Sequence, residues 1–277
     1  MAYAPSLEPT CNCTRTERSK VTEDIIDDTR QESREERSEY TFPNGVLYTG
    51  QWLGDLPDGF GSHIYPDGGK YRGMLQQGKA HGIGTYEYPD GSVFVGPWVS
   101  DKAHGVGVCT LQDGSMYRGQ WENGAQNGDG VLILANGTRF AGQYKDGAKS
   151  GQGVFTLRGE KEGCEYEGQF REDCFHGRGV YSWSDGRKYD GQWRMNKMHG
   201  HGSFYFPDGR SYTGQYMSDL KSGTGTFAWP DGRSYSGQFV KGQQHGVGFW
   251  TSANGSVRQG EWSEGHRIRW KGEVVSL

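Results

Sequence analysis

The feature that most constrains this chain is a repeat of 23 residues. A large aromatic residue recurs at that interval, and the interval resumes after one three-residue insertion. Glycine follows two residues later in each copy, and a large apolar residue two positions after that. A Gly-x-Gly pair comes next, and Asp-Gly or Asn-Gly then closes the unit. Such self-similarity predicts an array in which each unit packs against its neighbours only. The aromatic series is Tyr48, Tyr71, Phe94, Tyr117, Phe140, Tyr166, Tyr189, Tyr212 and Tyr235.

Each unit is predicted to form a β-hairpin. Apolar and polar residues alternate, as is typical of strands, and Pro66-Asp67-Gly68 favours a three-residue loop with a bulge. Counting outward from the equivalent loop in the next unit pairs Tyr86 with Phe94, so the aromatic residues of both strands share one face. The predicted fold class is therefore all-β, an elongated single-layer antiparallel sheet of about nine to ten stacked hairpins. At about 4.8 Å per strand, the ribbon would be on the order of 85 Å long.

Aromatic rings, rather than aliphatic side chains, are expected to supply the core. Only 32% of the chain is hydrophobic and 47 residues are Gly, but there are 9 Trp, 16 Tyr and 12 Phe. Glycine in a strand is costly in entropy, yet it allows a ring to lie over bare backbone. No helical segment between the units would cover the aromatic face. An open strip of that length exceeds the apolar patches usual on soluble monomers, which indicates a binding surface.

The motif Tyr-x-Gly-x-Trp-x-x-Gly-x-x-His-Gly-x-Gly is nearly complete in residues 71–84 and 235–248. It resembles the MORN (membrane occupation and recognition nexus) repeat, and the resemblance covers residues 40 to about 270. The resemblance implies a twisted antiparallel sheet with an aromatic-lined groove. It also implies a scaffold in radial spokes, other axonemal parts or cytoskeletal rings. Such proteins often form homodimers. The family name itself refers to an earlier assignment of membrane and phosphoinositide binding. MORN arrays are also fused to lipid kinases and lysine methyltransferases, but no such domain fits this sequence.

The array is predicted to span residues 40–277, with full repeats over 48–255. Residues 158–165 lengthen one turn and are expected to bend the ribbon or to extend a loop for contacts. Residues 256–277 are degenerate, since Arg258 replaces the tyrosine, and they are expected to form a terminal cap. Residues 1–39 are highly charged with few apolar anchors, which predicts a disordered or partner-ordered tail, or else a short helix.

A protein partner is predicted to bind the aromatic face. Tyr and Trp dominate binding hot spots, and an amphipathic helix has the shape that fits a long groove. The alternative is that these rings only hold the hairpins together. The predicted groove residues are Tyr48, Trp52, Tyr71, Phe94, Trp98, Tyr117, Trp121, Tyr166, Tyr189, Trp193, Tyr212 and Tyr235.

Three arginines share one slot just after the turn of adjacent hairpins: Arg187, Arg210 and Arg233. A row of this kind would suit weak contact with anionic lipid head groups or with an acidic partner surface. The alternative is a solvated edge that prevents aggregation between sheets.

No catalytic, metal-binding or cofactor-binding residues are predicted. Histidine recurs at one slot, but Asp58, Asn127, Ser150 and Ser222 fill the same slot elsewhere, which indicates turn chemistry. Gly-x-Gly would need a following helix to bind phosphate, and none is expected. The chain is therefore predicted not to be an enzyme and not to bind nucleic acid. The recurrent histidines are His81, His104, His176, His199 and His245.

The chain has no apolar run long enough for a membrane span, and its start lacks the features of a secretory signal. The chain has five cysteines, an odd number that does not suggest a framework of paired disulfides, and this favours free thiols in a reducing compartment. We therefore expect a cytoplasmic, cytoskeleton-associated scaffold or adaptor, in an axoneme (radial-spoke-like) or another cytoskeletal assembly. The alternatives are a peripheral membrane or phosphoinositide-binding module, and a regulatory subunit of a separate enzyme.

Overall fold

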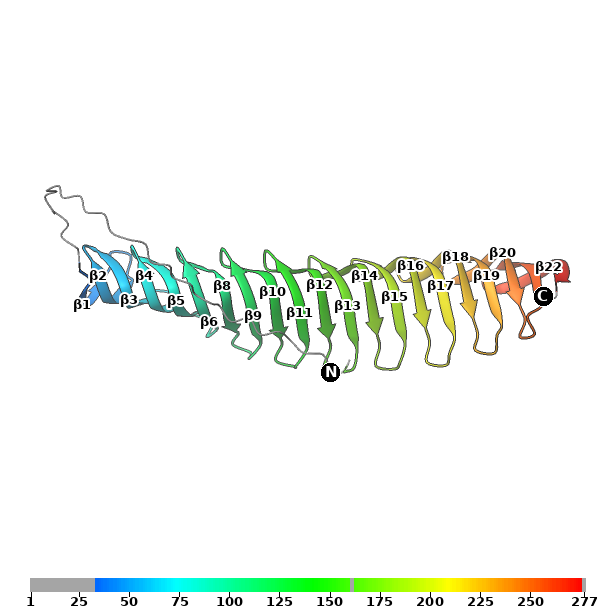
Figure 1. The fold of residues 1–277 in the computed structure, drawn as a ribbon, viewed down its shortest axis with the longest axis horizontal. Coiled ribbons are helices and arrows are strands. Elements are labelled where there is room, and N and C mark those ends of the chain that lie inside the picture. The colour runs from blue at the N-terminus through cyan, green and yellow to red at the C-terminus, as the bar shows by residue number, and fades with distance from the viewer. Residues whose placement is uncertain (1–32, 160–161, 276–277) are drawn as a thin grey trace, which may run out of the picture. The chain divides into compact units, whose positions relative to one another are not determined.

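The computed structural model describes residues 33–159 and 162–275 (Figure 1). The array lies within the unit Arg34–Leu277. The prediction of a disordered or helical tail therefore concerns mainly residues outside the described part of the chain.

The array is a single open antiparallel sheet of 22 strands, in which each strand pairs with its neighbours in sequence (Figure 1). The predicted fold class is confirmed. Two short strands, β7 and β8, both pair with β6 and so stand in for one longer strand. The strands are β1 (Glu35–Thr41), β2 (Leu47–Leu53), β3 (Leu56–Ile64), β4 (Lys70–Gln76), β5 (Lys79–Glu87), β6 (Val93–Val99), β7 (Lys102–Ala103), β8 (Gly105–Thr110), β9 (Met116–Glu122), β10 (Ala125–Ile133), β11 (Arg139–Lys145), β12 (Ala148–Thr156), β13 (Glu165–Arg171), β14 (Cys174–Ser182), β15 (Lys188–Arg194), β16 (Lys197–Tyr205), β17 (Ser211–Met217), β18 (Leu220–Ala228), β19 (Ser234–Val240), β20 (Gln243–Thr251), β21 (Val257–Ser263) and β22 (His266–Val275).

Strand β1 begins at Glu35, so the array starts five residues before the predicted boundary at residue 40. It pairs with β2, with Glu35 opposite Trp52 and Tyr40 opposite Tyr48. All seven of its residues are exposed, which is why no alternation of apolar and polar residues marks it. Backbone pairing, and not burial of its side chains, defines this strand.

The Pro-Asp-Gly turns have the predicted form. The Tyr65 N–H donates to the Gly69 carbonyl at 2.8 Å, and the Gly68 N–H donates to the Tyr65 carbonyl at 2.9 Å. Gly68 has a φ of +95°, a conformation that side-chain-bearing residues rarely adopt. His63 lies opposite Tyr71, so the aromatic residues of both strands face the same way, as predicted.

A second kind of turn lies at the other edge of the ribbon. It has two residues, and both have positive φ, as in Ser100 (+48°) and Asp101 (+68°). The Asp101 carboxylate accepts a hydrogen bond from the Ala80 N–H of the preceding unit at 2.7 Å. Asn196 does the same for Phe175, also at 2.7 Å. These turns therefore link neighbouring units as well as reversing the chain.

The first glycine of the Gly-x-Gly pair lies in a bulge that a glutamine side chain stabilises. In β16, residues 199–201 lie opposite the single residue Gln192 of β15. Gly200 has a φ of +62°, and the freed His201 N–H donates to Gln192 Oε1 at 2.8 Å. The sequence analysis did not anticipate this role, although the glutamine recurs. It occupies the same slot at Gln51, Gln120, Gln143, Gln169, Gln192, Gln215 and Gln238.

Replacing this glutamine should destabilise the bulge. We expect Gln192→Ala to lower the free energy of unfolding by about 1–2 kcal/mol, because the His201 N–H loses its acceptor. Urea denaturation followed by tryptophan fluorescence measures the change. Exposed Gln152, which offers its side chain to no bulge, is the matched control, and equal effects at Gln192 and Gln152 would contradict the assignment.

The buried rings rest on glycine, as predicted. Tyr189 is 0% exposed, and a Cβ built on Gly202 would lie 2.6 Å from its Cε2 atom. The Tyr189 hydroxyl donates to the Gln192 carbonyl at 2.9 Å. Trp193 of the same unit and Tyr216 of the next pack edge-to-face on this ring, with centroids 5.0 and 5.2 Å away. The aromatic core is therefore continuous from unit to unit.

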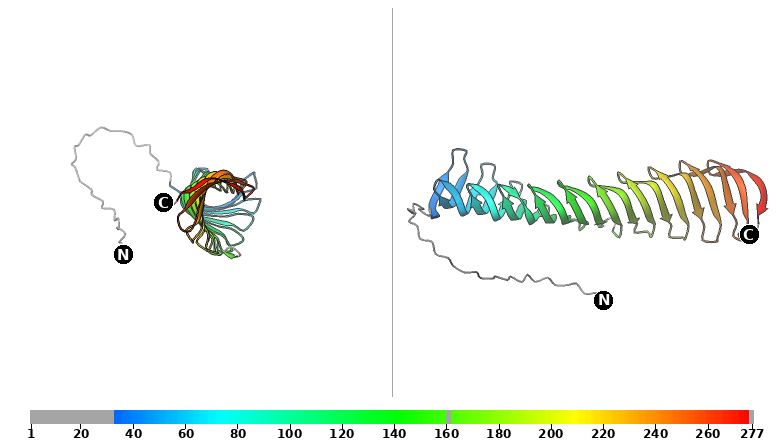
Figure 2. Two further views of the ribbon diagram at one scale, coloured as in Figure 1. Left: turned by 90° about the vertical axis from the view of Figure 1, so that its right-hand side faces the viewer. Right: turned by 45° about the horizontal axis from the view of Figure 1, so that its top comes forward.

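The two predicted irregularities leave the sheet unbroken. Residues 158–165 fall in and beside the turn between β12 and β13, whose pairing runs from Gly151–Phe170 to Thr156–Glu165. In the last unit, the Trp262 ring lies over Gly260, where a tyrosine or phenylalanine ring of the aromatic series lies in other units. Seen end-on, the strands of the array follow an arc (Figure 2).

Candidate partner-binding surface

The residues predicted to line a groove form the core of the array. The structure does bring them together, but the array's own residues cover them. Apart from Trp121, which is partly exposed, none is more than 7% exposed, and Tyr48, Phe94 and Tyr235 are 0% exposed. A partner therefore cannot touch most of these rings without unfolding the units. We call this set the inner row; it is Tyr48, Trp52, Tyr71, Phe94, Trp98, Tyr117, Trp121, Tyr166, Tyr189, Trp193, Tyr212 and Tyr235.

The polar atoms of the inner row are largely satisfied within the array. The Trp193 Nε1–H donates to the Gly179 carbonyl at 2.9 Å. Burial raises the pKa of Tyr48, Tyr117 and Tyr212 to about 12, so their hydroxyls stay protonated at neutral pH. These groups hold the units together.

A second set of aromatic residues lies beside the inner row; five of its seven rings are partly exposed, whereas Phe204 and Phe227 are buried. It comes from the later strand of each unit and from the residue just before the Pro-Asp-Gly or Ser-Asp-Gly turn. Ring centroids lie 5.4 Å apart between Trp183 and Phe204 and 5.3 Å apart between Trp229 and Trp250, so the set is continuous across units. We call this set the outer row; it is Tyr181, Trp183, Phe204, Phe206, Phe227, Trp229 and Trp250.

The outer row was not predicted as a site from the sequence. The available signal was a large apolar residue directly before the turn, such as Phe206 before Pro207. Nearer the N-terminus, the same position holds Tyr65 and Tyr88, and then Leu111 and Leu134. The aromatic character of this surface is therefore strongest from β14 to β20.

The three aligned arginines frame the outer row. Arg187, Arg210 and Arg233 each pair with the aspartate two positions earlier, at 2.8, 2.7 and 2.7 Å. Each guanidinium also lies over the ring four positions earlier, at 5.2, 5.0 and 5.8 Å from its centroid. Their positive charge is therefore partly neutralised and their side chains are held in place. Contact with anionic lipid stays an untested prediction.

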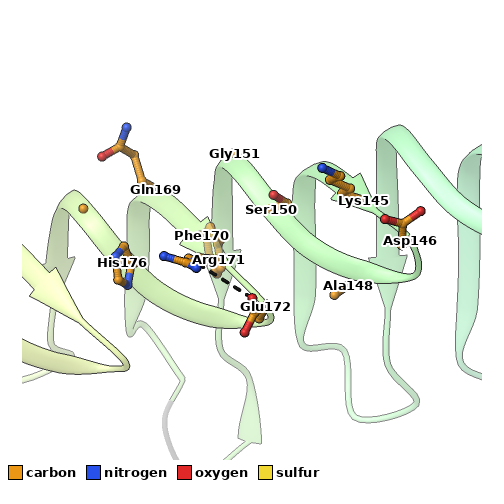
Figure 3. Close-up of a pocket in the computed structure, with 11 residues that line it drawn as sticks. Lys145, Asp146, Ala148, Ser150, Gly151, Gln169, Phe170, Arg171, Glu172 and His176 are labelled. Atoms are coloured by element: carbon orange, nitrogen blue, oxygen red, sulfur yellow. Dashed lines mark ion pairs between the residues drawn. The ribbon is translucent and has the colours of Figure 1, made fainter.

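A pocket lies beside two neighbouring two-residue turns (Figure 3). Its volume is 760 Å³, and Ser150 and His176 both contribute to its lining. These two residues occupy equivalent slots two strands apart, roughly 10 Å, which is beyond hydrogen-bond reach. No nucleophile and base are thus paired there. The remaining lining residues are Lys145, Asp146, Ala148, Gly151, Gln169, Phe170, Arg171, Glu172 and Gly177.

The same spacing separates the recurrent histidines of adjacent units, which is too far for one metal ion to bind two of them. Within residues 33–159 and 162–275, no group of three or more His, Cys, Asp or Glu side chains could hold a metal. Among these same residues, no helix is long and apolar enough to cross a membrane.

A protein-family model matches most of the array. The family model described as MORN repeat matches nine segments: 48–70, 71–93, 94–116, 117–139, 140–159, 166–186, 189–209, 212–232 and 235–257. The chain belongs to the MORN repeat family. MORN-repeat arrays are in general scaffolds that bind proteins or membranes, and they are generally non-catalytic. No curated protein matches this MORN protein at a significant level.

Solved structures show only a distant likeness to this MORN protein. The TCP10 domain of Danio rerio CPAP, in complex with a peptide of Danio rerio STIL, is 12% identical with a TM-score of 0.38. The match covers 87% of this chain and 100% of that one. The TCP domain of Drosophila melanogaster SAS-4 (dCPAP), in complex with a proline-rich motif of Ana2 (dSTIL), is 9% identical with a TM-score of 0.30. That match covers 72% of this chain and 98% of the other. Likeness at such scores supports no inference about partners.

Proposed function

We propose that this protein is a non-catalytic scaffold that binds a helix or peptide of a protein partner along the outer row. The observation that carries the proposal is the continuous line of rings from Tyr181 to Trp250, in which Tyr181, Trp183, Phe206, Trp229 and Trp250 are partly exposed beside the buried inner row. Such rings bury a large area at little cost in conformational entropy, because the inner row already fixes their positions.

The spacing of the units suits an amphipathic helix. Two strands advance the array by about 9.6 Å, whereas seven residues of an α-helix advance it by about 10.5 Å. One heptad of a partner helix would therefore span about one unit, and an apolar residue of each heptad would meet the next pair of rings.

Membrane binding is the alternative, and the geometry favours it less. Arg187, Arg210 and Arg233 would supply the attraction to anionic lipid, but each already has an aspartate partner within 2.8 Å. Flotation with vesicles that contain anionic lipid would reveal salt-sensitive binding if this alternative were correct.

We place this function in the cytoplasm, in a cytoskeletal assembly such as a radial-spoke-like part of an axoneme. The support is the family resemblance alone, and a homodimer or a regulatory subunit of a separate enzyme is compatible with the same surface. A tagged copy expressed in a ciliated cell should concentrate in the cilium, and its exclusion from the cilium and from other cytoskeletal structures would reject the placement.

Binding to the outer row predicts a large effect of two substitutions. We expect peptides selected from a random 16-residue display library to bind Phe206→Ala/Trp229→Ala at least about tenfold more weakly than the wild type. Fluorescence anisotropy measures the affinities, and circular dichroism checks that the variant is folded.

The matched control is Phe249→Ala. Phe249 is 50% exposed on the opposite face of the sheet, where it pairs with Ser236. Its replacement should leave peptide affinity unchanged. Equal loss at both sites, or loss at Phe249 alone, would show that the partner binds elsewhere.

A further inference from the structure

Lys221 places a positive charge among two rings of the outer row and one ring of the inner row. Its Nζ atom lies 4.6 Å from the ring centroid of Phe227, 5.2 Å from that of Tyr212 and 6.0 Å from that of Phe206. Burial, and secondly the charge of Arg210, lowers the pKa of this ammonium. Within the described residues its side chain makes no ion pair, whereas Arg210 is paired with Asp208.

Lys149 shows how the same array neutralises an equivalent lysine. Lys149 and Lys221 each occupy the second position of the strand that follows a two-residue turn. The Lys149 Nζ atom lies 3.1 Å from Asp173 Oδ1, and Asp173 belongs to the two-residue turn of the next unit. The residue that corresponds to Asp173 in the unit after Lys221 is Gly242. The internal carboxylate is therefore missing at Lys221.

We propose that Lys221 binds a carboxylate of the partner, so that the bound segment carries an Asp or Glu between the apolar residues that contact Phe206 and Trp229. This inference rests on the proposed function and names the chemistry of the partner at one point. A carboxylate is the group that would stabilise this ammonium most, because the bound partner also excludes water from the site. A charge-assisted hydrogen bond is stronger in such an environment than in bulk solvent.

Two variants separate the charge from the shape of the site. Lys221→Met removes the ammonium and keeps an unbranched apolar stem over the rings. Gly242→Asp keeps Lys221 and supplies the internal carboxylate that Lys149 has. The turn tolerates this residue, since Asp173 and Asp219 adopt φ of +63° and +72° at the same position. A Cβ at Gly242 would meet only Leu220 Cδ2, at 3.9 Å.

The probe is the random 16-residue display library, selected separately against the wild type, Lys221→Met and Gly242→Asp. Peptides from the wild-type selection should be enriched in Asp or Glu, and the two other selections should lack this enrichment. A peptide selected on the wild type should lose about tenfold in affinity for either variant. The same peptide with its acid changed to the amide should lose as much on the wild type and nothing further on Lys221→Met.

The outcomes are distinct. Peptides that bind the outer row equally well in all three proteins, without acid enrichment, would overturn the carboxylate inference and leave the proposed function intact. Failure of the wild type to select any peptide that depends on Phe206 and Trp229 would overturn both.

Discussion

Replacing Tyr189 by alanine is expected to lower the free energy of unfolding by about 3–5 kcal/mol. The ring is 0% exposed and packs edge-to-face on Trp193 and Tyr216, so its removal opens a cavity that two units share. Because contacts join only neighbouring units, the loss should decouple the array at this point. Urea denaturation followed by tryptophan fluorescence should show a lower midpoint and a broader transition.

Two further substitutions serve as controls for Tyr189→Ala. Tyr189→Phe keeps the ring and loses only the hydroxyl bond to the Gln192 carbonyl, so it should cost about 1 kcal/mol. Tyr205→Ala removes a ring that is 47% exposed on the other face, and it should cost no more than about 0.5 kcal/mol. A similar loss for Tyr189→Ala and Tyr205→Ala would refute the inner row as the core.

Adding one methyl group at Gly202 should also be costly. A Cβ there would lie 2.6 Å from both Cε2 and Cζ of Tyr189, and the ring has no free space to move into. We expect Gly202→Ala to lower the free energy of unfolding by about 2–3 kcal/mol through overpacking. Differential scanning calorimetry and urea denaturation both measure this change.

A double-mutant cycle identifies the cause of that loss. In the Tyr189→Ala background the clash is gone, so Gly202→Ala should cost less than about 0.5 kcal/mol. The coupling would then be about 2 kcal/mol. Additive effects of the two substitutions would mean that glycine is needed at this position for a reason other than the ring.

Local turn chemistry made much of the fold predictable. Pro66-Asp67-Gly68 determines a three-residue loop, the loop determines the pairing of His63 with Tyr71, and that parity places the rings on one face. The two-residue turns were not recognised: Ser100-Asp101 lacks the glycine that usually marks positive φ, but Asn123-Gly124 carries this signal and was overlooked. Strand β1 has no apolar pattern at all, so only its backbone pairing reveals it.

The extent to which each aromatic ring is buried could not be predicted from the sequence. Tyr189 and Trp229 are both large aromatic residues on the same face, but the first is sealed and the second is partly exposed. The difference arises because Trp193 and Tyr216 both close over Tyr189, and this depends on the curvature and twist of the assembled sheet. The lack of an ion-pair partner at Lys221 within the described part of the chain is similarly hard to predict, since the carboxylate that pairs with the equivalent Lys149 comes from the next unit.

Site-specific photo-crosslinking tests the central claim, that a partner lies along the outer row, most directly. A photoreactive phenylalanine analogue would replace Phe206 on the aromatic face or Phe249 on the opposite face, and the peptides selected on the wild type would be added before irradiation. We predict a crosslinked product from position 206 and none from position 249. Crosslinking from position 249 alone, or equally from both, would contradict the proposed binding surface.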